Sequence, residues 1–184
     1  GAHRNDDGGW DAGKAYLVLG ASLGATAEID LSDADYAFVG EEAYDYARFV
    51  SSAGDVDGDG LDDILVSAHS NDDGGADAGK VYLVLGASLG ADREIDLRNA
   101  DYAFIGETKN DYAGIAVAGA GDVDGDGLDD FVISAQNNDD GGTDAGKVYL
   151  VLGASLGMGS EIPLEEADYA FTGENERDYA RFVS

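Results

Sequence analysis

The chain of 184 residues contains no cysteine. This absence excludes disulfide bonds, thiolate catalysis and zinc sites built on sulfur ligands. A single proline stands against 28 glycines, which indicates many tight turns without the proline and serine bias of a disordered linker. No apolar run approaches the ~18 residues that a membrane-spanning helix needs, so we expect no membrane insertion.

Basic residues are also scarce in this chain. Ten Lys and Arg residues face 39 Asp and Glu residues, which leaves a formal net charge of −29. A field of that sign repels nucleic acids and anionic membrane surfaces, so we expect no nucleic-acid partner. Hydrophobic residues make up 44% of the chain, enough to build a core, and the acidity therefore does not indicate disorder.

The sequence repeats itself three times. The segment Gly13–Gly24 recurs almost unchanged at Gly79–Gly90 and at Gly146–Gly157, at intervals of 66 and 67 residues. Repeats of this length are typical of structures in which similar units pack side by side and bury a shared core.

Each copy contains short apolar runs that are rich in β-branched and aromatic residues. Examples are Ile64–Val66, Val81–Leu85, Tyr102–Ile105 and Ile115–Ala118, each bounded by turn-forming residues. Such runs indicate strands separated by turns. The chain is therefore predicted to be all-β, with β-propeller blades of four antiparallel strands; a β-solenoid is the second possibility, since its coils are usually shorter.

We expect one repeat domain over residues 1–184, with about 2.75 blades, which does not close alone because propellers usually have about 4–8 blades. The predicted parts are a partial blade at 1–40 (third and fourth strands), full blades at 45–106 and 111–173, and the first strand of a further blade at 178–184. An unpaired strand favours pairing with another chain. We therefore expect Asp178–Ser184 to add to a neighbouring copy, or the chain to be a fragment of a longer protein.

The clearest functional signal in the sequence comes from two loops that are identical to each other. Residues 55–63 and 122–130 both read Asp-Val-Asp-Gly-Asp-Gly-Leu-Asp-Asp. Calcium takes about six to eight oxygen ligands, and this pattern offers carboxylates at positions 1, 3, 5 and 9, a carbonyl at position 7 and a glycine for the sharp turn at position 6. The predicted Ca²⁺ ligands are Asp55, Asp57, Asp59, Leu61, Asp63, Asp122, Asp124, Asp126, Leu128 and Asp130.

An EF-hand is the natural alternative for such a loop. An EF-hand needs a bidentate glutamate at position 12, where this chain has Val66 and Ile133. The residues that follow the loops also indicate a strand and not a helix. The sequence therefore predicts calcium loops between β-strands.

The segment around the second loop resembles a known repeat. Residues 112–121, the loop itself and the run Phe131–Ala135 are similar to the FG-GAP repeat, the blade unit of integrin α-subunit propellers. The resemblance implies four-stranded blades with calcium held between the first and second strands, on the ten residues named above. The chain departs from the family pattern at Ala113-Gly114 and at Ser134–Gln136, where the Phe-Gly pair and the Gly-Ala-Pro triplet belong, and neither departure removes a ligand.

A second acidic segment recurs at 5–11, 71–77 and 138–144. It reads Asn-Asp-Asp-Gly-Gly followed by one variable residue and Asp, and is either a second cation loop or a long polar turn with local side-chain hydrogen bonds. His3 and His69 occupy one repeat position that holds Gln136 in the other copy, which argues against a general base.

No nucleophile with its base, phosphate loop or cofactor motif is present, so we expect a protein that is not an enzyme. The expected function is a calcium-binding module for adhesion or protein interaction, extracellular or at the cell surface, with a protein or glycan ligand. A self-assembling filament or array subunit is the alternative, and an enzyme domain on a propeller scaffold is the less favoured one.

Overall fold

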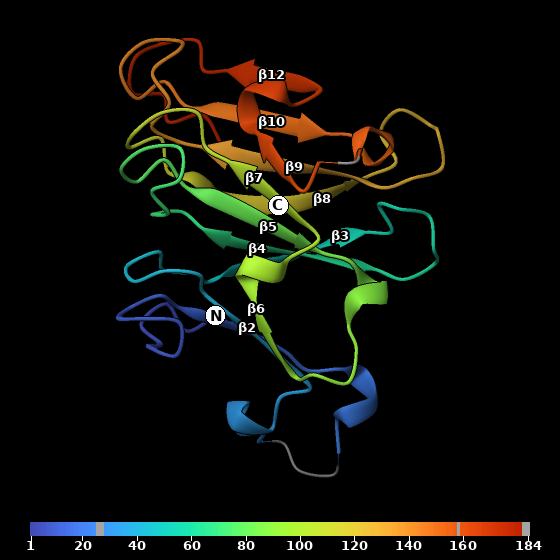
Figure 1. Cartoon of the computed structure of the whole chain (residues 1–184). Coiled ribbons are helices and arrows are strands. Elements are labelled where there is room, and N and C mark those ends of the chain that lie inside the picture. The colour runs from blue at the N-terminus through green and yellow to red at the C-terminus, as the bar shows by residue number, and fades with distance from the viewer. Residues whose placement is uncertain (25–27, 158, 182–184) are drawn as a thin grey trace.

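The computed structural model describes residues 1–24, 28–157 and 159–181, and these form an all-β structure of three sheets (Figure 1). The described strands are β1 Lys14–Leu17, β2 Tyr36–Val39, β3 Phe49–Gly54, β4 Asp63–Ala68, β5 Lys80–Val84, β6 Glu94–Asp96, β7 Tyr102–Ile105, β8 Ala113–Gly121, β9 Asp130–Ala135, β10 Lys147–Val151, β11 Glu161–Pro163 and β12 Tyr169–Thr172.

Helical structure in the described ranges is limited to single 3₁₀ turns. They are η1 Gly20–Ser22, η2 Leu31–Asp33, η3 Gly86–Ser88, η4 Leu97–Asn99, η5 Gly153–Ser155 and η6 Leu164–Glu166. None of these described turns is long and apolar enough to cross a membrane.

The sheets follow the repeat of the sequence. In the central sheet the antiparallel order is β3-β4-β5-β7, and the next sheet repeats it as β8-β9-β10-β12. Strands β1 and β2 form the matching outer half of a preceding sheet. The prediction of four-stranded blades is therefore confirmed, and the three sheets do not close into a ring within the described residues.

The second and third blades each also place a short strand on the sheet of the blade before them. Strand β6 pairs in parallel with β2, and β11 pairs in parallel with β7. This pairing is absent from the sequence prediction, because three residues with one central isoleucine carry too little periodicity to identify a strand. It joins neighbouring sheets through backbone hydrogen bonds.

The core lies between adjacent sheets. Phe104 and Phe131 come from neighbouring blades and meet edge to face, with ring centroids 5.2 Å apart, in a cluster that includes Leu65 and Tyr149. A second cluster around Phe38 and the buried face of the central sheet joins the first and second blades. The repeated Phe of the Asp-Tyr-Ala-Phe motif is thus an inter-blade residue.

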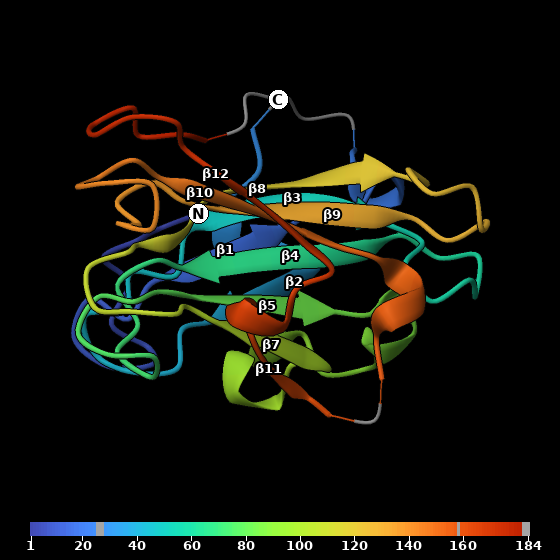
Figure 2. The same cartoon turned by 90° about the horizontal axis from the view of Figure 1, so that it is seen from above.

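Consecutive connections in an antiparallel sheet leave from opposite ends of its strands. The β3–β4 and β8–β9 connections contain the two predicted calcium loops, and both views place them on the same side of the stack (Figures 1 and 2). We call this side the loop end, and the side with the β4–β5 and β9–β10 turns the lysine end.

The terminal segment differs from its prediction in part. The backbone N–H groups of Arg177, Tyr179 and Ala180 donate to the carbonyls of residues 143, 144 and 145 of the same chain, at 2.8–3.1 Å. The beginning of segment 178–184 is therefore already paired within the chain, as in the two preceding copies. Residues 182–184 lie outside the described ranges.

Candidate metal sites at the loop end

The two acidic loops are shaped by their own carboxylates. In the first loop, Asp55 accepts hydrogen bonds from the backbone N–H groups of Gly58 (2.8 Å) and Gly60 (2.9 Å). Gly58 and Gly60 have φ values of 78° and 88°, a conformation that glycine adopts without steric cost. Asp122 makes the same two contacts in the second loop, to Gly125 and Gly127.

Three of the predicted carboxylates converge in each loop. One oxygen each of Asp55, Asp57 and Asp63 lie within 4.8 Å of one another, and Asp122, Asp124 and Asp130 form the matching group. Asp59 and Asp126 do not belong to these groups and instead accept from the N–H groups of Leu61 and Leu128, at 2.8 Å. The fourth carboxylate and the Leu carbonyl of each loop remain predicted ligands.

The last carboxylate of each loop is fixed by the sheet. Asp63 is fully buried and Asp130 is 1% exposed. Asp63 accepts from the N–H groups of Val56 and Gly86, both at 2.8 Å. Burial raises the pKa of Asp63, and the charges of Asp57 and Asp59 raise it further, while the two backbone hydrogen bonds oppose the shift.

This donor set fits a hard divalent cation. The converging ligands are all carboxylate oxygens, with no nitrogen or sulfur among them. Like charges this close repel one another, and no Lys or Arg pairs with either group in the described part of the chain. A bound cation would remove that repulsion.

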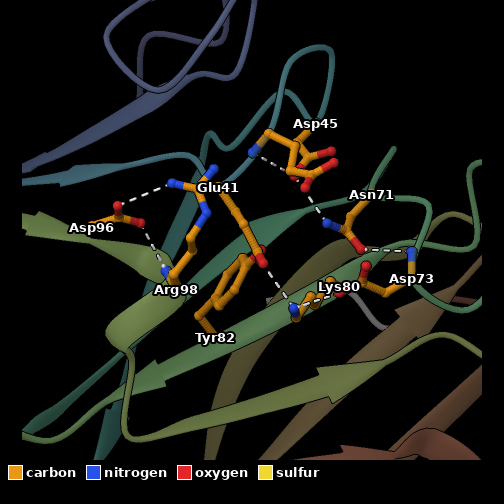
Figure 3. A network of polar contacts seen from close by, with 9 residues as sticks. Glu41, Asp45, Asn71, Asp73, Lys80, Tyr82, Asp96 and Arg98 are labelled. Atoms are coloured by element: carbon orange, nitrogen blue, oxygen red, sulfur yellow. Dashed lines mark hydrogen bonds and ion pairs between the residues drawn. The ribbon is translucent and has the colours of Figure 1, made fainter.

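The lysine end carries acids of a different kind. Lys80 is buried and binds Glu41 of the preceding blade (2.9 Å) and Asp73 (2.6 Å), as Figure 3 shows. Burial would lower the pKa of Lys80, but hydrogen bonds to Asp73 and Glu41 together with their charges raise it overall. Lys147 repeats the arrangement with Glu107 and Asp140.

The Asn-Asp-Asp-Gly-Gly segments lie at this end and form polar turns. Asn71 accepts from the N–H of Asp73 and donates its amide to Asp45 of the β2–β3 connection, at 3.0 and 2.9 Å. Asp72 accepts from the N–H of Asp77 at 2.8 Å. Of the two interpretations offered by the sequence, the described contacts fit the polar turn, and the metal-ligand groups found among the described residues lie only in the loops.

The lysine network was missed at the level of sequence, because a lysine at a strand start usually indicates an exposed position. A signal was nevertheless present. Lysine stands at the same repeat position in all three copies, seven residues after an aspartate, and a glutamate begins the otherwise variable segments at 41, 107 and 174.

The histidine position holds an aromatic cluster. His69 lies 5.9–6.4 Å from the rings of Tyr46, Phe49 and Tyr112. Burial lowers the pKa of His69 to about 4, aided by the nearby charge of Arg48. The contacts of His69 to these rings are those of a packing residue.

Comparison with protein families now decides what the repeats are. Residues 49–84 and 113–151, which contain both acidic loops and the strands around them, match the FG-GAP repeat. These segments are FG-GAP repeats. The family assignment made from the residues of the second loop is thereby confirmed.

Curated proteins that are similar in sequence to this chain include integrin α chains of animals. Integrin alpha-PS2 of Drosophila melanogaster is 33% identical over 123 residues, 64% of this chain and 8% of the relative. Integrin alpha pat-2 of Caenorhabditis briggsae is 27% identical over 177 residues, 95% of this chain and 14% of the relative. The chain thus spans less than a sixth of the length of these curated relatives.

Proposed function

We propose that this chain is a calcium-binding FG-GAP propeller module that acts outside the cell or at its surface, in adhesion or protein interaction, and is not an enzyme. The observation that carries the proposal is the convergence of three carboxylates in each of two identical loops. The ten predicted ligands in residues 55–63 and 122–130 would hold one Ca²⁺ per loop. The similarity to integrin α chains supports an extracellular location and a protein ligand, with a glycan as the other ligand class.

Calcium would serve the fold by neutralising the loops. A ligand that binds only the native state stabilises it by RT ln(1 + [L]/Kd), about 2.7 kcal/mol at a hundredfold excess over Kd. For a chain of this size each kcal/mol raises Tm by about 2–4 °C. With one Ca²⁺ in each of two loops this stabilisation doubles, so we expect calcium to raise Tm by about 10–20 °C over the same chain in chelator.

Matched variants test the site itself. Asp57→Asn should remove at least half of the calcium-dependent rise in Tm, and Asp57→Asn combined with Asp124→Asn should remove nearly all of it. Asp92→Asn makes the same charge change at an exposed residue outside the loops and should leave the rise intact. A Tm that does not respond to excess chelator, with no heat of calcium binding in calorimetry, would overturn the proposal.

Self-association is a second proposed role, favoured by the open face of the last sheet. Phe38 and Phe104 are fully buried, whereas the equivalent Phe171 is 57% exposed. Strand β11 covers β7, but no strand in the described ranges covers β12. We propose that a second copy of the chain packs against this face and also against the terminal segment 178–184.

The two outer faces of the chain are complementary. Glu174 and Asp178 stand where Glu41 and Asp45 bind the lysine and asparagine of the following blade. The first blade offers Lys14 at the corresponding position, where Glu94 and Asp7 now hold it, at 2.8 and 2.7 Å. A second copy could supply the same contacts head to tail.

Light scattering across a range of protein concentrations tests this role. We expect the average mass to rise with concentration, and Phe171→Glu to weaken association by about tenfold or more, which corresponds to 1.4 kcal/mol. Tyr44→Glu changes an aromatic residue of similar exposure, 56%, in the β2–β3 connection between the first and central sheets, away from β12, and should leave association unchanged. A strictly monomeric chain at high concentration would contradict the proposal.

A further inference from the structure

The two acidic loops are joined by direct hydrogen bonds. The backbone N–H of Asp129 donates to the carbonyl of Asp55 at 3.0 Å. In return, the backbone N–H of Asp55 donates to the Asp129 carboxylate at 2.9 Å. The first residue of one loop is therefore held on both sides by the eighth residue of the other.

Close packing supports the same contact. A Cβ atom on Gly54 would lie 2.1 Å from Oδ2 of Asp129, and one on Gly153 would lie 2.6 Å from the carbonyl oxygens of both Val56 and Asp129. Real Cβ atoms do not approach other atoms so closely, so glycine at both positions permits the approach of the loops. The contact is therefore close-packed and not a single mobile side chain reaching across solvent.

The equivalent positions of the other copy make no such contact. Asp62 corresponds to Asp129 but is exposed, and its side chain forms no hydrogen bond among the described residues. Val56 is fully buried, whereas its equivalent Val123 is 51% exposed. The repeats thus provide a natural control, with the same residue in contact at one position and free of hydrogen bonds at the other.

We propose that Asp129 is a positioning residue that couples the two loops, so that a cation in either loop raises the affinity of the other. This inference rests on the proposed function of the loops as calcium sites. Asp129 is not itself a predicted ligand, but it directly precedes the buried ligand Asp130 and holds the backbone of the ligand Asp55. Ordering one loop therefore orders the first ligand of the other.

Such coupling must be reciprocal. Calcium affinity at the first loop should fall by about fivefold or more when Asp124→Asn disables the second loop, and the second loop should weaken by the same factor when Asp57→Asn disables the first. Calorimetry gives the affinities, and the amide NMR signals of Gly60 and Gly127 report the loops separately.

Variants at the paired positions isolate the role of Asp129. In an Asp129→Ala background the two loops should bind independently, within about twofold, whereas Asp129→Asn keeps an acceptor oxygen and should retain most of the coupling. Asp62→Ala should behave as the unchanged chain. In chelator, hydrogen exchange of the Asp55 amide should be faster in Asp129→Ala than in Asp62→Ala, since its acceptor is lost.

The outcomes separate this inference from the proposed function. If both loops bind calcium but independently in the unchanged chain, or if coupling survives in Asp129→Ala, the coupling role is overturned while calcium binding stands. If neither loop binds calcium, the proposed function fails, and the coupling fails with it. Equal melting temperatures of the two alanine variants in chelator would show that the loss of coupling is not a loss of fold.

Discussion

The two ends of the blades handle the same excess of negative charge in opposite ways. At the lysine end, Lys80 and Lys147 each lie between an aspartate of their own blade and a glutamate that precedes that blade, and asparagine amides bind further carboxylates; Figure 3 shows the contacts of Lys80 and Asn71. At the loop end, the converging carboxylates have only backbone N–H groups as partners in the described structure. One end is neutralised from within the chain, whereas the other leaves room for a cation.

This difference teaches that acidity alone does not identify a metal site in this protein. Both ends carry clusters of aspartate, and both are shaped by side-chain to backbone hydrogen bonds. They differ because only the lysine end contains lysine side chains that pair with its carboxylates. The calcium response should therefore belong to one end only.

The largest effect is expected from breaking the neutralised end. Lys80→Met leaves Glu41 and Asp73 without their cation next to the buried ring of Tyr82. Removing one partner of a buried pair costs about 3–5 kcal/mol, and we expect a loss near the lower figure because Asp73 is 44% exposed. Urea unfolding should show the same loss in calcium and in chelator.

Lys109→Met is the control for this prediction. Lys109 is exposed and forms no ion pair within the described part of the chain, so its loss should change stability by no more than about 0.5 kcal/mol. A Lys80→Met protein that calcium restored to full stability would contradict the separation of the two ends.

The next largest effect is expected at Asp45. Its side-chain partner at the lysine end is the neutral amide of Asn71 and not a charged lysine. Burial raises the pKa of Asp45 to about 6, opposed by hydrogen bonds from Asn71 and from the N–H of Glu42. The folded chain holds this proton more tightly than the unfolded chain, so the contribution of Asp45 to stability is lost as pH rises from about 4 to about 6. A shift of this size corresponds to up to about 3 kcal/mol.

Asp45→Asn should abolish this loss of stability between about pH 4 and about pH 6. Both hydrogen bonds end on the same oxygen, Oδ2, so an asparagine can keep them. Relative to the unchanged chain, the free energy of unfolding of the variant should rise across pH 4–6, as measured by urea unfolding at each pH. Asp92→Asn serves as the surface control, and parallel pH profiles for Asp45→Asn and the unchanged chain would refute the assignment.

The smallest effect is expected from replacing one aspartate by asparagine at each end, at Asp124 in the second loop and at Asp140 at the lysine end. In chelator, Asp124→Asn should stabilise the chain by about 1 kcal/mol or less, because it relieves repulsion in an uncompensated loop. Asp140→Asn should destabilise it by a similar amount, because it removes a partner of Lys147. Urea unfolding of the two variants should therefore give changes of opposite sign, and changes of the same sign would show that the ends do not differ.

Sequence reasoning was most successful where one short segment contains the whole signal. The strands of the blades, the acidic loops and the repeat itself are local patterns, and the structure contains them where they were expected, except that the described part of segment 178–184 forms no strand. The contacts that join blades were not predicted: the parallel strands β6 and β11, the Lys80–Glu41 pair and the Asp129–Asp55 bonds all link residues far apart in the chain.

The reason is that a repeat shows what its copies share but not which copies touch. Asp62 and Asp129 are identical in sequence context, yet only Asp129 reaches another loop, because it alone faces a preceding loop in the described structure. The glutamates at 41, 107 and 174 begin segments that otherwise vary between the copies, so the sequence does not show what they contact. The structure shows that Glu41 and Glu107 each pair with the lysine of the following blade.

The parallel strands β6 and β11 also imply an order of folding. Strands β6 and β11 belong to blades that come later in the chain than the strands they pair with. The outer edges of β2 and β7 therefore stay unpaired until the next blade has been synthesised. On a ribosome, where N-terminal segments emerge first, every new blade would close the edge of the one before it while exposing its own. Exposed edges are sites of mispairing, and synthesis from the N-terminus would leave only one such edge open at a time.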